Sequence, residues 1–357
     1  MRVNFVLPLL IRTPIGGYRV VFEYADGLAR LGHDVSIVYP RRWGPDPGPV
    51  GRVKDALWPL KKRLVDRPLV PWHRFHPGVS HRLGATIDAR TVPDADATVA
   101  TAWQTAKPVA ALPAAKGAKL YLIQHYETWS GDAAEVDATW RLPLHKVVIA
   151  AWLAEVGRGL GADDMCHIPN GLDFSRFRVT RPIENRPMRV VSMYHHEPFK
   201  GVPNALAALA SFHEIHPDVP VTMFGTPARG PDIPDWIAYR RDPSQEELVD
   251  ALYNGHSVYL GASLQEGWGL PPMEAMACGC TFVGTDIGGF REFAVHGETA
   301  LLSVPGDIGA MTGHLVRFAR EPALRERMQL AAARHVRRFT WERACASLVD
   351  RIARARA

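Results

Sequence analysis

The stretch VNFVLPLLIRTPIGGYRVVFEYADGLARLGHDVSIVY, residues 3–39, shows one complete α/β unit. Val3–Leu10 is apolar enough for a buried strand. A helix follows, with an apolar face at helical spacing formed by Val21, Tyr24, Ala25, Leu28 and Ala29. Gly32 stands where a glycine ends a helix, and Val35–Tyr39 is a second apolar strand. Strand, helix and strand in this order predict a parallel pair joined by a right-handed crossover.

The same alternation continues along the chain and predicts an α/β fold with doubly wound parallel sheets. At 357 residues the chain exceeds the usual size of one domain. The segment from Ile168 to Pro187 is rich in Pro, Gly, Asn and Arg without a clear period, which is typical of a linker. The sequence therefore predicts an N-terminal domain at 1–167, a linker at 168–187, a C-terminal domain at 188–338 and a terminal helical segment at 339–357.

Composition excludes several classes of protein. Hydrophobic residues make up 47% and charged residues 22%, as in soluble globular proteins. No apolar run approaches the ~18 residues of a membrane span. The apolar N-terminus lacks a cleavage site and is interpreted as a strand. Four cysteines form neither a disulfide framework nor a zinc motif. We expect a reduced, cytoplasmic protein that does not bind nucleic acid.

Positive charge is concentrated between Arg41 and Arg82. This region holds ten Lys or Arg residues against three Asp, a local net charge of +7 in a chain whose total is +5. Trp58, Lys61, Lys62 and Arg63 lie near its centre. A basic amphipathic helix with Trp favours anionic headgroups, so a peripheral membrane face is one interpretation. An ordinary helix with solvated cations is the other, and the sequence leaves both open.

The stretch SLQEGWGLPPMEAMACGC, residues 263–280, carries the chemistry. A strand ends just before it, and a glycine loop leads into a helix that we expect to begin at Pro272. Gly267 and Gly269 let backbone N–H groups approach a ligand, and the helix N-terminus adds positive potential. Such a site suits a diphosphate. Glu266 and Glu274 would then accept hydrogen bonds from sugar hydroxyls on either side of it.

This motif resembles the donor site of retaining GT-B glycosyltransferases of the bacterial family 4 type. The similarity extends over nearly the whole chain. It includes the Gly16-Gly17 opening, Ile168–Asp173, Lys200-Gly201, Phe224-Gly225, the Gly288–Glu292 segment and the Gly297–Asp307 segment. The resemblance implies two Rossmann-like domains facing a cleft, with the C-terminal helix packing back on the N-terminal domain.

The resemblance also implies roles for individual residues. Glu274 matches the glutamate that binds the ribose, and Glu266 matches the one near the transferred sugar. Lys200 matches a lysine that neutralises the diphosphate, and His125 matches a histidine facing the donor sugar. His125, Lys200 and Glu266 are therefore the expected catalytic residues. Backbone groups of the donor site would come from Gly17, Gly267, Trp268, Gly269 and Leu270.

One position departs from the family pattern. The family places an arginine six positions before the lysine, where this sequence has Tyr194. His195 and His196 follow and could supply charge or hydrogen-bond donors, although a neutral His stabilises a diphosphate less than Arg does. The base would meet a loop around Tyr239 and Arg240, which we expect after a strand.

The resemblance implies transfer of a hexose or deoxyhexose, with retention, from a nucleotide sugar to a glycan or lipid-linked acceptor in cell-envelope polysaccharide synthesis. No D-x-D-like metal motif is apparent, so we expect a metal-independent enzyme without a cofactor. Peripheral contact with the inner face of the plasma membrane is a further expectation. Two alternatives remain: a nucleotide-sugar epimerase of the same architecture, and a nucleotide-sugar-binding protein with little catalytic activity.

Overall fold

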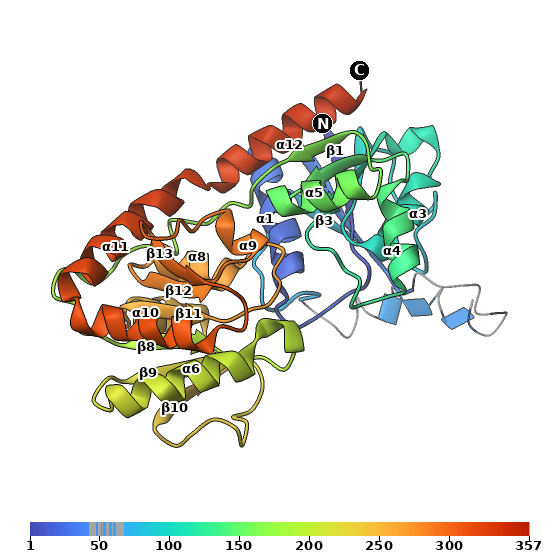
Figure 1. The fold of residues 1–357 in the computed structure, drawn as a ribbon. Coiled ribbons are helices and arrows are strands. Elements are labelled where there is room, and N and C mark those ends of the chain that lie inside the picture. The colour runs from blue at the N-terminus through green and yellow to red at the C-terminus, as the bar shows by residue number, and fades with distance from the viewer. Residues whose placement is uncertain are drawn as a thin grey trace. The chain divides into compact units, whose positions relative to one another are not determined.

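Two compact units divide the chain (Figure 1). The computed structural model describes residues 1–42 and 68–356, together with residues 48, 51, 53, 54, 57, 58, 60 and 61 between them. The first unit contains residues 1–171 and the C-terminal helix α12 (Trp341–Arg356), and the second contains residues 172–340. The expected linker, 168–187, extends further than the boundary at Gly171. Residues 172–187 are counted with the second unit because Phe177, Ile183 and Arg186 are buried there.

A parallel sheet of seven strands forms the first unit within the described residues, in the order β3-β2-β1-β4-β5-β6-β7. Its strands are β1 (Arg2–Val6), β2 (Asp34–Pro40), β3 (Val79–Gly84), β4 (Ala97–Ala100), β5 (Ala118–Ile123), β6 (His145–Val148) and β7 (Met165–His167). Its helices, besides α12, are α1 (Gly16–Arg30), α3 (Trp103–Ala110), the 3-10 turn η1 (Ala114–Lys116), α4 (Ala133–Trp140) and α5 (Ala151–Gly159).

Helix α1 confirms the strand–helix–strand prediction. It ends as expected, because Gly32 has a φ of +81° and the N–H of His33 donates to the carbonyl of Leu28 over 3.1 Å. Helix α1 also packs against α12. A side chain at Gly27 would collide with the Sγ of Cys345, so the absence of one lets α12 lie close. The rings of Tyr24 and Trp341 then meet edge to face at 5.2 Å.

The second unit is built on a parallel sheet of six strands among the described residues, in the order β10-β9-β8-β11-β12-β13. Its strands are β8 (Val190–Met193), β9 (Val221–Gly225), β10 (Ile237–Arg241), β11 (Val258–Gly261), β12 (Thr281–Thr285) and β13 (Ala300–Ser303). Its helices are η2 (Pro198–Lys200), α6 (Val202–Ile215), α7 (Gln245–Glu247), the π-helical η3 (Leu248–Tyr253), α8 (Leu270–Ala277), α9 (Gly288–Arg291), α10 (Ile308–Arg320), α11 (Pro322–His335) and η4 (Val336–Arg338).

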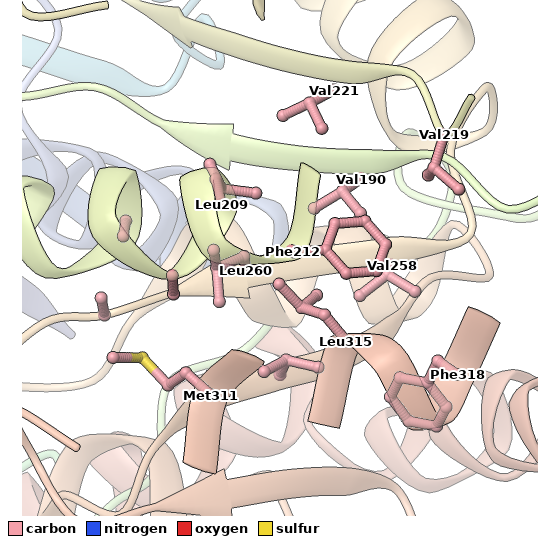
Figure 2. Packing of buried hydrophobic residues seen from close by; sticks show 14 of the residues in the cluster. Val190, Leu209, Phe212, Val219, Val221, Val258, Leu260, Met311, Leu315 and Phe318 are labelled. Atoms are coloured by element: carbon pink, nitrogen blue, oxygen red, sulfur yellow. The ribbon is translucent and has the colours of Figure 1, made fainter. Parts of the chain in front are cut away.

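A single apolar cluster fixes the sheet of the second unit. Figure 2 shows Leu209 and Phe212 of α6, and Leu315 of α10, among the side chains of β8, β9 and β11. Leu209, Phe212 and Leu315 are fully buried. Burial of each such side chain contributes about 1.5–3 kcal/mol, so the strand ends are rigid supports for the loops that follow them.

Candidate active site

Two loops of the second unit meet at the place where its strand order reverses. The chain runs outward from β8 to β9 and β10, then returns to β11 on the other side of β8. The carboxyl ends of β8 and β11 therefore flank a topological switch point, where open α/β sheets bind ligands. Lys200 lies on the loop after β8 and Glu266 lies on the loop after β11.

The structure joins these two predicted residues in an ion pair. Nζ of Lys200 donates to Oε1 of Glu266 over 2.8 Å and to Oε2 over 3.0 Å. The hydroxyl of Ser263 donates to the same Oε1 over 2.9 Å. Both charged side chains are largely buried, with exposed fractions of 18% and 12%. The ammonium and the carboxylate are thus held in place by each other and by Ser263.

Glycines explain why the loops come so close. Gly201 follows Lys200 with a φ of +62°, and a Cβ there would collide with the carbonyl oxygen of Ala262. A Cβ on Gly289 would lie 2.6 Å from the carbonyl oxygen of Glu266. Only glycine permits these backbone approaches, so Gly201 and Gly289 set the spacing around the ion pair. Both glycines belong to segments that carry the family resemblance, Lys200-Gly201 and Gly288–Glu292.

Helix α8 begins two residues earlier than expected. Gly269, with a φ of +104°, is its N-cap, Leu270 is its first residue, and a proline occupies the first turn. The prediction of a start at Pro272 was therefore wrong, because a glycine in the left-handed region lets the helix begin immediately after it. The side chain of Trp268 is buried against Phe293 and Phe339, so only its backbone is available to a ligand.

Glu274 lies in the first two turns of α8 and is 3% exposed. One of its oxygens accepts a hydrogen bond from the hydroxyl of Tyr253 over 3.1 Å. The charges of Glu266 and Glu274 both act on Tyr259, whose pKa is raised first of all by its own burial. Both glutamates therefore lie near the same buried tyrosine of β11.

Tyr194 does not supply the charge of the missing arginine. It is 4% exposed, and its hydroxyl donates to Oδ1 of Asp232 over 2.8 Å. Burial, and then Asp232, raise its pKa to about 12. Burial and the nearby Lys200 lower the pKa of His195, which makes this ring neutral at pH 7. Its Nδ1 faces the N–H of Glu197 at 3.1 Å, so Nε2 carries the proton and is a neutral donor.

Tyr239 and Arg240 lie within β10 and not in a loop after a strand, so that prediction was wrong. The hydroxyl of Tyr239 donates to the carbonyl of Pro227 over 2.8 Å. Nε of Arg240 lies 3.8 Å from Glu247 at the surface. β10 is an edge strand with exposed positions, which weakens the hydrophobic pattern that marks a strand.

Other predicted residues belong to the first unit. Gly17 lies at the start of α1, beside the side chain of Gln124. His125 follows β5, and its ring meets Trp129 edge to face at 4.2 Å. Trp58 is partly buried and Lys61 is exposed, whereas Lys62 and Arg63 lie outside the described residues.

No three side chains of His, Cys, Asp or Glu converge as metal ligands within the described part of the chain. None of the described helices has both the length and the apolar character needed to span a bilayer.

Sequence comparison places the second unit within a known family. Residues 173–335 match the family described as glycosyl transferases group 1. The chain is 35% identical over 124 residues to D-inositol 3-phosphate glycosyltransferase of Streptomyces bingchenggensis, which covers 34% of this chain and 27% of that protein. It thus spans about a quarter of the length of the first curated relatives it matches.

Two comparisons extend over the whole chain. Phosphatidyl-myo-inositol mannosyltransferase of Mycolicibacterium smegmatis is 23% identical, over 96% of this chain and 90% of that protein. The structure of HepE from Anabaena, solved with UDP and glucose, has a TM-score of 0.75 at 14% identity, over 99% of this chain and 100% of that one. At this identity the likeness shows the fold alone, and it confirms the predicted GT-B architecture of two parallel-sheet α/β domains.

Proposed function

We propose that this chain, whose residues 173–335 match the family of group 1 glycosyl transferases, transfers a hexose or deoxyhexose from a nucleotide diphosphate sugar with retention of configuration. The acceptor would be a glycan or a lipid-linked glycan of the cell envelope. The observation that carries the proposal is the Lys200–Glu266 ion pair at the switch point of the second unit.

The arrangement supports a diphosphate between the cation and the glycine loop. Lys200 carries three N–H donors, and its pairing with Glu266 leaves donor capacity for phosphate oxygens. The first backbone N–H groups of α8 have no partner within the helix and attract negative charge. Glu266 would accept from hydroxyls of the transferred sugar, and Glu274 from the ribose, as the family resemblance implies.

Retention would follow from attack on the face that the diphosphate leaves. The bond from the anomeric carbon to the phosphate oxygen breaks, and a bond to the acceptor oxygen forms. The acceptor hydroxyl proton passes to the departing phosphate oxygen. The protein would act by orientation and by stabilising the negative charge that develops on the diphosphate. His125 keeps its predicted role opposite the donor sugar as part of this proposal.

Transfer is proposed to proceed without a metal ion, with Lys200 and the N-terminus of α8 as the positive groups. The test compares initial rates after treatment with EDTA and after addition of Mg²⁺ or Mn²⁺. Equal rates are expected. Loss of transfer with the chelator and its return with either cation would overturn this part.

Membrane contact is proposed for the basic region of the first unit. Val53, Leu57 and Leu60 recur at helical spacing and are 61%, 59% and 59% exposed, and Lys61 lies beside them. An apolar stripe with adjacent cations suits an anionic bilayer. Co-sedimentation with phosphatidylglycerol vesicles should fall when Lys61, Lys62 and Arg63 become Gln, whereas equal sedimentation would contradict the contact.

A thermal-shift panel of UDP-, GDP-, TDP- and ADP-sugars tests the donor. One base class should raise the Tm, and that donor should then be consumed in the presence of an acceptor extract. An epimerase would convert the same donor without any acceptor, so product analysis separates the two activities. The absence of a shift with every nucleotide sugar would overturn the proposed function.

A further inference from the structure

The first unit has its own topological switch point, between β1 and β4. From β1 the chain runs outward to β2 and β3, and it returns to β4 on the other side of β1. The loops after β1 and β4 therefore diverge at the carboxyl ends of these strands, which is where open α/β sheets bind ligands. Of the donor-site roles considered above, those of Gly17 and His125 fall at this edge of the sheet.

Three loops of the first unit meet at this edge. The Cβ position of Gly17, after β1, lies 3.5 Å from the amide of Gln124, after β5. The hydroxyl of Tyr18 donates to the carbonyl of Leu9 over 2.8 Å and fixes the loop after β1. The loop after β4 leads directly into α3, whose first N–H belongs to Trp103.

Glu127 joins the loop after β5 to the start of α3. Its Oε2 accepts from the N–H of Trp103 over 3.0 Å. The residue at the N-cap of α3 is Ala102, which has no side-chain acceptor, so Glu127 caps the helix from a distance in sequence. This contact accounts for one carboxylate oxygen only.

The second oxygen of Glu127 has no such role. Oε1 makes no hydrogen bond, and no cation pairs with the carboxylate, within the residues that the structure describes. The side chain is partly exposed, and desolvation raises its pKa to about 7. This second oxygen can therefore accept a hydrogen bond from a hydroxyl-bearing ligand.

Two tryptophans lie close to Glu127 in the fold or the sequence: Trp103 at the start of α3, which Glu127 caps, and Trp129 two residues further along the same loop. The indole of Trp103 donates to the hydroxyl of Ser130 over 2.9 Å, and Ser130 donates to the carbonyl of Glu127 over 3.0 Å. A side chain at Gly131 would collide with the ring of Trp103. Trp129, on the same loop, is 48% exposed. Its ring meets His125 edge to face at 4.2 Å. An exposed aromatic ring and a carboxylate two residues apart on one loop supply a flat apolar surface and a hydrogen-bond acceptor.

We infer that Glu127 and Trp129 form a binding site for a neutral polyhydroxylated ring, a sugar or a cyclic polyol, in the first unit. The ring would place its apolar face on Trp129 and donate hydroxyls to Oε1 of Glu127. An anionic ligand is disfavoured because the carboxylate would repel it. The inference rests on the proposed function, since this ring would be the acceptor end of the reaction.

The test uses the full chain and four neutral probes: methyl α-D-mannopyranoside, methyl α-D-glucopyranoside, methyl α-L-rhamnopyranoside and myo-inositol. Saturation-transfer NMR should detect binding of at least one probe to the unaltered chain. Glu127→Gln retains a carbonyl oxygen that can accept from the Trp103 N–H, and it should weaken the binding of that probe at least tenfold. Trp129→Ala, at an exposed position, should weaken it similarly, whereas the exposed Glu155→Gln should not.

Each outcome bears on the inference. Binding of no probe, or equal binding by Glu127→Gln and the unaltered chain, overturns it. The nucleotide-sugar panel is run on the same samples. If a nucleotide sugar raises the Tm but no probe binds in a way that depends on Glu127, only the proposed sugar site is contradicted. If no nucleotide sugar raises the Tm, the proposed function itself is contradicted.

Discussion

The ammonium of Lys200 lies 2.8 Å and 3.0 Å from the two carboxylate oxygens of Glu266, although 66 residues separate them along the chain. Each residue follows a strand that ends at the switch point of the second unit. A largely buried cation is stable there because it pairs with the Glu266 carboxylate, which also accepts a hydrogen bond from Ser263. Under the proposed function, this pairing would hold the cation in place for the diphosphate, which is the condition for electrostatic catalysis without reorganisation.

Gly201→Ala should separate the two loops that carry this ion pair. The new Cβ would meet the carbonyl of Ala262, and the left-handed φ adds about 1 kcal/mol of strain. We expect at least a tenfold loss of transfer. Gly297→Ala is the matched control, because Gly297 has a φ of +80° with open space around it. Gly297→Ala should lower the stability of the fold but not the rate of transfer. Equal transfer rates for Gly201→Ala and Gly297→Ala would contradict the proposed role of Gly201.

Glu274→Gln should weaken the binding of the nucleoside part of the donor and leave the binding of its diphosphate unchanged. The amide oxygen can still accept from Tyr253, so the fold should be retained. Isothermal titration should show weaker binding of the nucleoside diphosphate and unchanged binding of inorganic pyrophosphate. Tyr253→Phe is the control for a purely structural role of this hydrogen bond. If Glu274→Gln weakened both ligands equally, the ribose assignment would be wrong.

Tyr194→Phe should affect stability more than catalysis. The change removes the hydroxyl that donates to Asp232, a loss of about 1 kcal/mol, which corresponds to about 2–4 °C in Tm for a domain of this size. The diphosphate should bind nearly as well, because this hydroxyl is engaged with a carboxylate. A tenfold or larger fall in nucleotide-sugar affinity with unchanged Tm would mean that Tyr194 contacts the donor.

Glu127 should make stability depend on pH. Its pKa is raised from 4.5 to about 7 by burial, so the folded state binds its proton more tightly than the unfolded chain does. This contribution to stability is complete below about pH 4.5 and is lost as the pH rises through about 7. The charge of Glu127 also acts on Tyr18 and Tyr121, but burial raises the pKa of both hydroxyls, so they stay protonated over this range.

The measurement is the Tm of the unaltered chain and of Glu127→Gln between pH 4.5 and 8. The Tm of Glu127→Gln should rise relative to that of the unaltered chain as the pH rises. A difference in Tm that stays constant over this range would contradict the raised pKa of Glu127.

Several parts of the fold could be predicted from the sequence because their signals are local. Helix α1 shows its apolar face and its terminal glycine within 17 residues of sequence. β10 was missed because an edge strand buries little and its last two residues are arginines. β3 was missed for the same reason, since its interior holds Ser80, His81 and Arg82.

The candidate site was predictable in its residues but not in their pairing. The motif around Glu266 pointed to Lys200 only through the family resemblance, and their contact depends on Gly201 and Ala262 from different loops. The partner of Tyr194 is Asp232, 38 residues away, within a segment that carries no motif. The capping role of Glu127 depends on a helix that starts 24 residues before it. Such contacts follow from tertiary packing and leave no local signal.

The central claim is that Lys200 holds the diphosphate of a nucleotide sugar at the switch point of the second unit. Isothermal titration of the unaltered chain, of Lys200→Met and of the exposed control Lys107→Met tests it, with the nucleoside diphosphate selected by the thermal-shift panel as ligand. The account predicts at least a hundredfold weaker binding by Lys200→Met and unchanged binding by Lys107→Met. Equal affinity for the diphosphate in all three proteins, with Lys200→Met correctly folded, would contradict it.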